Sequence, residues 1–350
     1  MISFFSSYIS PLATKYIKDV LDSGMLSEGK VVATFEREFE NSFDLIKNSV
    51  VMVNSGTSAL HLAIETLKGR GEIILPANTF VATGFAIKYA RCTPVFCDIL
   101  PDGTIDPADV KRKITIRTVA VIGVNWAGRE CDDRLEKVCF DAEVPLIIDA
   151  AQSLGCKIRG TITCLSFQAT KHLSTGDGGA LIFTSPETYE KAKRLRWFGI
   201  SKQSITGLLG EREYSLGSVG FKYHMNDFTA ALGLANLRNI QDRLAYYKTL
   251  ASLYTQSLKS VTPLHTERSS YWSYPILVDD VNKFSSFCRD REIPCSIIHR
   301  GIDHNPVFGG VNNSLINQRK WEKTVTHLPI HSGMTVQDIG WICHEVNKYV

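Results

Sequence analysis

One lysine in this sequence has unusual surroundings for a charged side chain. Lys171 follows an apolar run at residues 163–167 and precedes a glycine-rich turn that leads into a second apolar run at 180–184. A lysine held partly buried in such a turn can have a lowered pKa and act as a nucleophile. Asp149 ends another apolar run upstream. Together they suggest an amine that forms a Schiff base with pyridoxal phosphate, and an acid that keeps the ring nitrogen of that cofactor protonated.

A candidate phosphate site begins where the apolar run 50–53 ends. Ser55, Gly56, Thr57 and Ser58 follow it and lead into an apolar stretch with helical spacing. The first N–H groups of a helix and the positive end of its dipole attract anions, so this turn could bind a phosphate. An ordinary N-cap gives the same pattern, because Ser and Thr are preferred there. The turn alone does not separate the two interpretations.

Three further positions also have a functional and a structural interpretation. Asp149 could cap the next helix, and Gln152 could complete a capping box rather than reach a cofactor oxygen. Phe80 could stack on a flat cofactor or belong to the core. All these residues follow predicted strands, in the order phosphate turn, aromatic ring, acid and lysine. Their common location at carboxyl ends of strands is more specific than any single motif.

Other nucleotide-binding classes are disfavoured. The sequence contains neither a P-loop motif nor Gly-x-Gly-x-x-Gly, so P-loop enzymes and Rossmann-type nicotinamide or flavin enzymes do not fit. No metal site is expected either. His327 and His331 are four positions apart, but Pro329 lies between them and prevents a helical pair of ligands.

The segments that position these residues alternate between strands and helices. Short runs rich in Val and Ile predict buried strands at residues 50–53, 72–75, 93–98, 118–124, 146–151, 163–167 and 180–184. Helical stretches are expected at residues 12–21, 31–43, 58–67, 81–89 and 132–140. This alternation predicts an α/β fold whose large domain has a seven-stranded, mostly parallel sheet between helices.

The character of the sequence changes after about residue 246. A helix followed by apolar runs at 273–278 and 295–298 predicts a smaller C-terminal α/β domain. We expect residues 25–245 to form the large cofactor-binding domain. Residues 1–24 and 246–350 are expected to form the small domain.

Composition places the chain among ordinary globular proteins. It has 350 residues, of which 44% are hydrophobic and 21% charged. The net charge of +3 is too small to indicate binding to nucleic acid or to an anionic membrane. Nine scattered cysteines without a Cys-x-x-Cys motif predict reduced thiols and a cytoplasmic location. We expect no signal peptide, and no apolar run approaches the ~20 residues of a membrane span.

The chain resembles the sugar-nucleotide aminotransferases of the DegT/StrS type, including viosamine-synthase-like 4-aminotransferases. These are pyridoxal-phosphate enzymes of fold type I. The resemblance runs almost from end to end and is carried by residues 26–29, 35–36, 55–60, 75–83, 94–98, 149–152, 166–179, 196–199, 220–227 and 328–335.

The resemblance implies a role for individual residues. Lys171 would form the Schiff base and move protons, and Asp149 would pair with the pyridinium nitrogen. The other expected cofactor contacts are Gln152 at the ring hydroxyl, Phe80 stacked on the ring, and Gly56, Thr57, Ser58 and Ser166 at the phosphate. In this family a loop of the neighbouring subunit completes the phosphate site. Here that loop carries Lys222 and His224, and either could make the contact.

Position in the family also suggests substrate contacts at Asn125, Trp126, His299 and Arg300, although plain loop structure explains them equally well. The implied reaction moves an amino group from glutamate to a nucleotide-linked keto-6-deoxyhexose, expected to be the 4-keto form. The product would be an amino sugar for glycan synthesis, made by a homodimer.

Two alternatives stay open at this point. Some relatives are pyridoxamine-dependent sugar dehydratases, but these replace the lysine with histidine, so Lys171 favours transamination. The other alternative is a non-catalytic, cofactor-binding regulatory protein. The sequence has no helix-turn-helix segment or basic arm that would support DNA binding.

Overall fold

A central sheet of seven strands organises the molecule. The computed structural model describes residues 2–67, 69–200, 214 and 216–350. The strand order is β1-β7-β6-β5-β4-β2-β3. The strands are β1 (Val50–Val53), β2 (Glu72–Pro76), β3 (Thr93–Cys97), β4 (Thr118–Val124), β5 (Leu146–Asp149), β6 (Ile162–Ser166) and β7 (Gly179–Phe183). β7 runs antiparallel to both of its neighbours, and the other pairs are parallel. The predicted α/β fold of type I is therefore confirmed.

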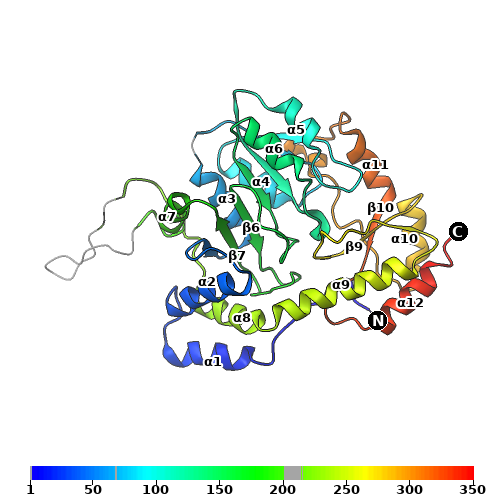
Figure 1. Ribbon diagram of the computed structural model, residues 1–350, viewed down its shortest axis with the longest axis horizontal. Coiled ribbons are helices and arrows are strands. Elements are labelled where there is room, and N and C mark those ends of the chain that lie inside the picture. Colours follow the sequence, from blue (N-terminus) through cyan, green and yellow to red (C-terminus); the bar gives the residue numbers. More distant parts are fainter. Residues whose placement is uncertain (1, 68, 201–213, 215) are drawn as a thin grey trace.

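Helices cover both faces of this sheet (Figure 1). They are α2 (Lys30–Ser42), α3 (Gly56–Thr66), α4 (Val81–Tyr89), α5 (Pro107–Lys113), α6 (Arg134–Asp141), α7 (Pro186–Leu195) and α8 (Asp227–Leu237). Successive strand residues point to opposite faces, so Ile73 and Ile74 belong to different core clusters. This burial on both faces explains why the strands are continuous apolar runs.

A second, smaller sheet lies toward the C-terminus. Its strands β8 (Thr262–Pro263), β9 (Tyr274–Leu277) and β10 (Val325–Leu328) are antiparallel. The long helix α9 (Ile240–Ser257) runs from the main sheet to this region (Figure 1). The remaining helices are α10 (Val281–Arg289), α11 (Ile316–Thr324) and α12 (Val336–Val346). The predicted run at 295–298 forms only an isolated bridge, Ser296 to His327, rather than a strand.

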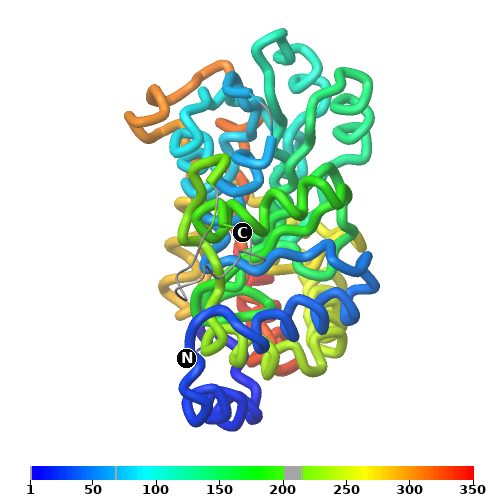
Figure 2. The backbone as a smooth tube through the Cα atoms, turned by 90° about the vertical axis from the view of Figure 1, so that its left-hand side faces the viewer, coloured from blue at the N-terminus to red at the C-terminus, as the bar shows by residue number. Residues whose placement is uncertain are grey.

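The N-terminal segment contacts two parts of the molecule. Helix α1 (Ala13–Ser23) packs against α8, and both views show it at the periphery (Figures 1 and 2). Ile2 instead packs against the core around α9 and α12. The division into domains 25–245 and 1–24 with 246–350 stays a prediction.

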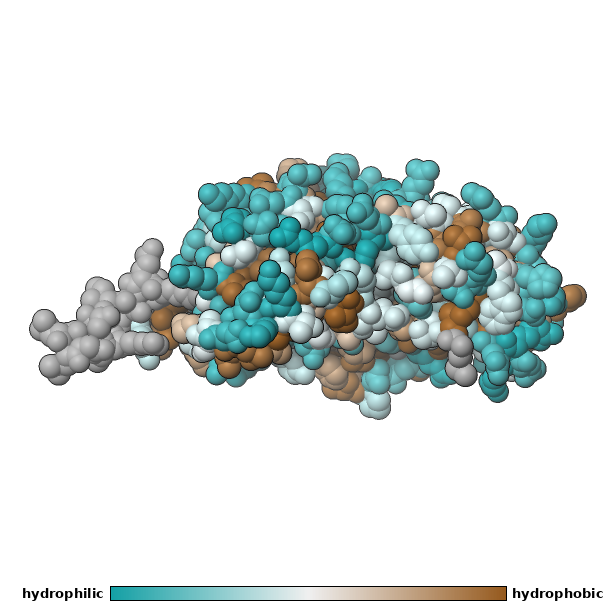
Figure 3. Space-filling model, turned by 90° about the horizontal axis from the view of Figure 1, so that it is seen from below, coloured by the Kyte–Doolittle hydropathy of each residue, from teal (hydrophilic) through white to brown (hydrophobic). Residues whose placement is uncertain are grey.

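The surface mixes hydrophilic residues with separate apolar patches, as the view from below shows (Figure 3). In the described part of the chain, no helix is both long and apolar enough to cross a bilayer.

Asp227 ties the start of α2 to the start of α8. Its carboxylate is buried and accepts hydrogen bonds from three backbone N–H groups, those of Gly29 (2.8 Å), Val31 (3.3 Å) and Val32 (2.9 Å). These groups have no partner within a helix, so the carboxylate satisfies donors that burial would otherwise leave unpaired.

We therefore expect Asp227→Ala to lower the free energy of unfolding by about 2 kcal/mol, because a buried cap with several donors is lost. Asp227→Asn keeps one acceptor oxygen and should cost less. Urea denaturation followed by circular dichroism measures both. Asp19→Ala, at an exposed position of α1, is the control and should change stability by less than ~0.5 kcal/mol. Equal stability of the Asp227 and Asp19 variants would contradict this account.

Candidate active site

The carboxyl ends of several strands open onto one cavity of about 480 Å³. Residues that line it follow β1, β2, β5 and β6, as expected where parallel strands end at one edge of a sheet. The opposite walls come from the C-terminal part and from Phe5. The cavity brings together Gly56, Thr57, Phe80, Asp149, Gln152, Ser166, Lys171 and His299 among the residues predicted from the sequence.

Asp149 is the buried carboxylate at the bottom of the site. It accepts hydrogen bonds from the Thr83 hydroxyl (2.7 Å) and from the Ala151 N–H (3.1 Å). Burial raises the pKa of Asp149, and these hydrogen bonds and the charge of Lys171 oppose that rise. A cationic ligand group beside Asp149 would therefore be strongly favoured, since it would restore the charge balance that water supplies at the surface.

Lys171 is held at the end of a tight turn after β6. Its N–H donates to the carbonyl of Gln168 (2.8 Å). Burial lowers the pKa of Lys171 to about 8, and the negative charge of Asp149 opposes this. The amine therefore releases its proton near pH 8, which an exposed lysine with a pKa of ~10.4 does not. Such a lysine can serve as a nucleophile or a general base.

The start of α3 forms the candidate phosphate turn. Ser55 is its N-cap, and the Ser55 hydroxyl accepts from the Ser58 N–H (3.0 Å). A Cβ atom on Gly56 would lie 2.8 Å from Cβ of Ser166 and 3.1 Å from its Oγ. A glycine is therefore required here, and it lets the Ser166 hydroxyl face the first N–H groups of the helix. The cap does not exclude an anion site, because Ser55 supplies the cap and Ser55, Gly56 and Thr57 all line the cavity.

Together these groups fit the pyridoxal phosphate predicted from the sequence. The helix start and the cradle between Gly56 and Ser166 suit a phosphate, Asp149 suits a protonated ring nitrogen, and Lys171 suits an aldehyde. The Oε1 atom of Gln152 accepts from the Ala127 N–H (2.7 Å), which leaves its amide nitrogen to donate to a ligand oxygen. These individual roles stay predictions.

Phe80 and His299 stand on the wall of the cavity. The ring of Phe80 is 50% exposed, and its centroid lies 5.0 Å from that of His299. Burial and the charge of Lys171 lower the pKa of His299 to about 4, so its imidazole is neutral at pH 7. Ile298, just before it, has φ of 63°, a left-handed conformation that is rare for a β-branched residue.

Four of the predicted residues lie outside this cavity lining. The Ser58 hydroxyl donates to Asn54 (2.6 Å), and Asn125 is buried between Ser153 (2.9 Å) and the Cys131 N–H (3.0 Å). Trp126 is buried behind His299, with ring centroids 5.9 Å apart. Arg300 is exposed. For Asn125 the contacts are those of a residue that holds a loop.

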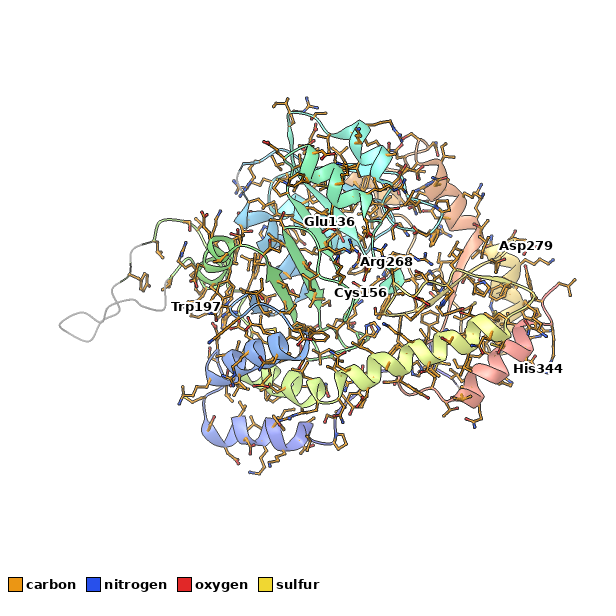
Figure 4. All side chains as sticks on the ribbon, viewed as in Figure 1. Glu136, Cys156, Trp197, Arg268, Asp279 and His344 are labelled. Carbon is orange, nitrogen blue, oxygen red and sulfur yellow. The ribbon has the colours of Figure 1, made fainter. Side chains whose placement is uncertain are left out.

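Lys222 and His224 also lie away from the cavity lining. Lys222 is exposed and pairs with Trp197 in an isolated bridge, and the ring of His224 lies 4.3 Å from that of Trp197. Trp197 lies beyond α7, at the opposite end of the molecule from Asp279 and His344 (Figure 4). Neither side chain lines the cavity of its own subunit, as far as the described residues show.

Three residues of the site were not predicted from the sequence. Thr83 lies on α4, four residues after Thr79, which precedes that helix. The Thr79 hydroxyl is 2.7 Å from the Thr83 hydroxyl, and the Thr83 hydroxyl donates to Asp149. The i, i+4 spacing of two threonines after a strand could have indicated it. Trp272 and Phe5 reach the cavity from distant parts of the chain. No local pattern predicts such contacts.

A cluster of possible metal ligands lies apart from the cavity lining. Asp303, His304 and Glu322 have ligand atoms within 4.8 Å of one another. The guanidinium of Arg319 donates to Asp303 (2.9 Å) and lies 2.6 Å from Nε2 of His304. The positively charged guanidinium of Arg319 already lies within this cluster, so the cluster is an ion-pair network.

Nearly the whole chain is similar to known proteins. The model of the DegT/DnrJ/EryC1/StrS aminotransferase family matches residues 8–347. GDP-perosamine synthase of Vibrio cholerae is 30% identical, over 100% of this chain and 99% of its own. The dTDP-4-dehydro-2,3,6-trideoxy-D-glucose 4-aminotransferase of Saccharopolyspora spinosa is 32% identical over 70% of this chain and 68% of its own. The crystal structure of the sugar aminotransferase CalS13 from Micromonospora echinospora superposes with a TM-score of 0.92, at 26% identity and over 100% of both chains.

The lowered pKa of Lys171 can be tested directly. In the cofactor-free protein, acetic anhydride should acetylate Lys171 with half-maximal reactivity near pH 8, because only the neutral amine reacts. Exposed lysines should reach half-maximal reactivity about two pH units higher. Quantitative mass spectrometry of the Lys171 peptide over pH 6–11 gives the curve. A profile that coincides with that of exposed lysines would contradict the proposed burial of this amine.

Proposed function

This chain belongs to the DegT/DnrJ/EryC1/StrS aminotransferase family, and from that membership we propose that it transfers an amino group from glutamate to a nucleotide-linked 4-keto-6-deoxyhexose. The family depends on pyridoxal phosphate. The observation that carries the proposal is the shared cavity of Lys171, Asp149 and the start of α3, which offers an amine, a buried acid and an anion site to one ligand.

The cofactor, when bound, supplies an aldehyde that reacts with amines and a ring that accepts electrons. Asp149 would hold a proton on the ring nitrogen, because burial raises the pKa of its carboxyl and a neighbouring cation favours the charged carboxylate. The amine of Lys171 would hold the proton and move it between Cα of the amino donor and C4′ of the cofactor. Its pKa of about 8 suits both halves of that transfer.

The choice of a sugar substrate is supported by the relatives. One of them is named for GDP-perosamine, and another for a dTDP-linked 4-dehydro sugar that lacks its 6-hydroxyl group. The two names differ in the nucleotide, so our proposal extends only to a nucleotide-linked 4-keto-6-deoxyhexose. The exposed ring of Phe80 offers an apolar surface at the edge of the cavity.

The proposal includes a homodimer. Lys222 and His224 do not line the cavity of their own subunit, as far as it is described, and their loop precedes α8 at the surface. In the dimer, either Lys222 of the partner subunit or His224 of the partner subunit would contact the phosphate. A cation there would balance a charge that the start of α3 holds only through N–H groups and hydroxyls.

The central test is amination by the purified protein with Lys171→Ala as the inactive variant. With glutamate and a panel of nucleotide-linked 3-keto and 4-keto sugars, the wild type should yield 2-oxoglutarate and an amino sugar, both measurable by mass spectrometry. Lys171→Ala should lower turnover by on the order of a thousandfold or more, because nucleophile and proton carrier are lost together.

Lys88→Ala, at an exposed position of α4, serves as the control and should keep full activity. Full turnover by Lys171→Ala would refute the mechanism. A dehydrated keto sugar formed without glutamate consumption would instead indicate a sugar dehydratase.

Thr83 offers a second, finer test. Thr83→Val removes the hydroxyl that donates to Asp149 and should raise the pKa of that carboxyl further. The weaker interaction with a protonated ring should lower cofactor retention and kcat/KM about tenfold. Ultrafiltration measures cofactor retention and initial rates give kcat/KM. Thr83→Ser restores the hydroxyl and should recover most of both, whereas an equal loss in the two variants would point to packing alone.

A further inference from the structure

The side chain of Lys171 does not end in open space within the cavity. Its Nζ atom lies 3.8 Å from the centroid of the Trp272 ring. An ammonium group over an indole face is attracted by the negative charge of the ring face, and the attraction is larger where water is excluded. Trp272 is only 5% exposed, so the contact lies in such a place.

Trp272 also holds the backbone beside the lysine. Its Nε1–H donates to the carbonyl of Thr170 at 2.9 Å. The preceding residue, Tyr271, is buried and has φ of 54°, a conformation uncommon outside glycine. The unfavourable backbone angle is thus at Tyr271, directly before the residue whose indole packs against the lysine turn. One side chain thereby contacts the amine by its face and the adjacent peptide by its N–H.

The N-terminal segment fixes the far side of the indole. Phe5 stacks on Trp272 with ring centroids 4.6 Å apart and an angle of 24° between the planes. Two hydrogen bonds anchor this segment nearby. The Ser7 hydroxyl donates to the carbonyl of Ala169 (2.6 Å), and the Ser10 N–H donates to Asn236 (2.7 Å). Residues 5, 171 and 272 therefore form a stack of ring, ring and amine.

We propose that Trp272, backed by Phe5, is a positioning residue for Lys171, which it holds by the indole face and by the clamp on Thr170. Its use in the reaction rests on the proposed function, because a transaminating lysine is released and must be recaptured in each half-reaction. A π face gives the free ammonium a defined place beside the reacting carbon. A carboxylate there would instead hold the charge more tightly and compete with proton transfer.

The test measures the acetylation profile of Lys171 in the cofactor-free, full-length chain. The indole face favours the charged amine, so its loss should lower the pKa of Lys171. We expect Trp272→Leu to shift the profile down by roughly half to one pH unit. Trp272→Phe keeps a ring face but loses the N–H clamp, and should shift the profile less than half as far. Phe5→Leu should give a smaller shift in the same direction as Trp272→Leu.

Ile9→Ala, at an exposed position of the same N-terminal segment, should leave the profile unchanged. Circular dichroism confirms that each variant is folded. If Trp272→Leu does not fold, Phe5→Leu and Trp272→Phe still decide the question. An unchanged or raised pKa in Trp272→Leu, or in Phe5→Leu where that is the folded variant, would overturn the proposal.

Amination assays separate this inference from the proposed function. Measured over a range of sugar concentrations, Trp272→Leu should lower kcat by a larger factor than it raises KM. The pH dependence of its kcat should shift to lower pH than in the wild type. If the wild type aminates no sugar, the proposed function is wrong, but the acetylation result for Trp272 is unaffected. If Trp272→Leu aminates the sugar normally and the acetylation profile of its Lys171 does not shift, only the proposed role of Trp272 is wrong.

Discussion

The candidate site depends on two groups of opposite charge that face one cavity at the edge of a sheet, the buried carboxylate of Asp149 and the half-buried amine of Lys171. Burial opposes the charged form of both groups, since it lowers the pKa of the amine and raises that of the acid. Each group alone would be destabilising there, and each moderates the shift of the other. The neighbouring structure adds further partners, namely the Thr83 hydroxyl and the Ala151 N–H at the acid and the Trp272 face at the amine. A ligand that carries both an aldehyde and a protonated ring nitrogen would complete the balance.

The parallel sheet explains why such a pair can be placed at all. Strand ends deliver Asp149 and Ser166 to one edge with little freedom, because both faces of the sheet are packed. The other walls are less constrained by the sheet. They come from residues 5, 272 and 298–299, which reach the cavity from the N-terminal segment and the C-terminal part. The carboxylate and the candidate phosphate turn thus lie at the edge of the sheet, whereas the residues proposed to position Lys171 come from the other walls.

The sequence predicted most of what the sheet determines and little of what packing determines. All seven strands were visible because most are buried on both faces and all read as short apolar runs, whereas α5 is too short for a helical period to show. Asp149, Lys171 and Gly56 could be placed because each follows a strand end. Phe5 and Trp272 could not, since their contacts join segments 100 or more residues apart in the chain. Asn125 and Trp126 were expected either to contact the substrate or to be plain loop structure. Both are buried and lie outside the cavity lining, and a substrate contact stays a prediction.

The turn at the start of α3 shows how a structural and a functional interpretation can both hold. From the sequence, the Ser-Gly-Thr-Ser segment is either an N-cap or an anion site. In the structure the cap is present and the turn also faces the cavity. The Ser55 hydroxyl accepts from the Ser58 N–H and lies 2.8 Å from the Ser58 hydroxyl, while Ser55, Gly56 and Thr57 all line the cavity. The cap fixes the first turn of the helix, whose N–H groups are those that an anion would bind, so the serine that looked like an alternative to binding is compatible with it.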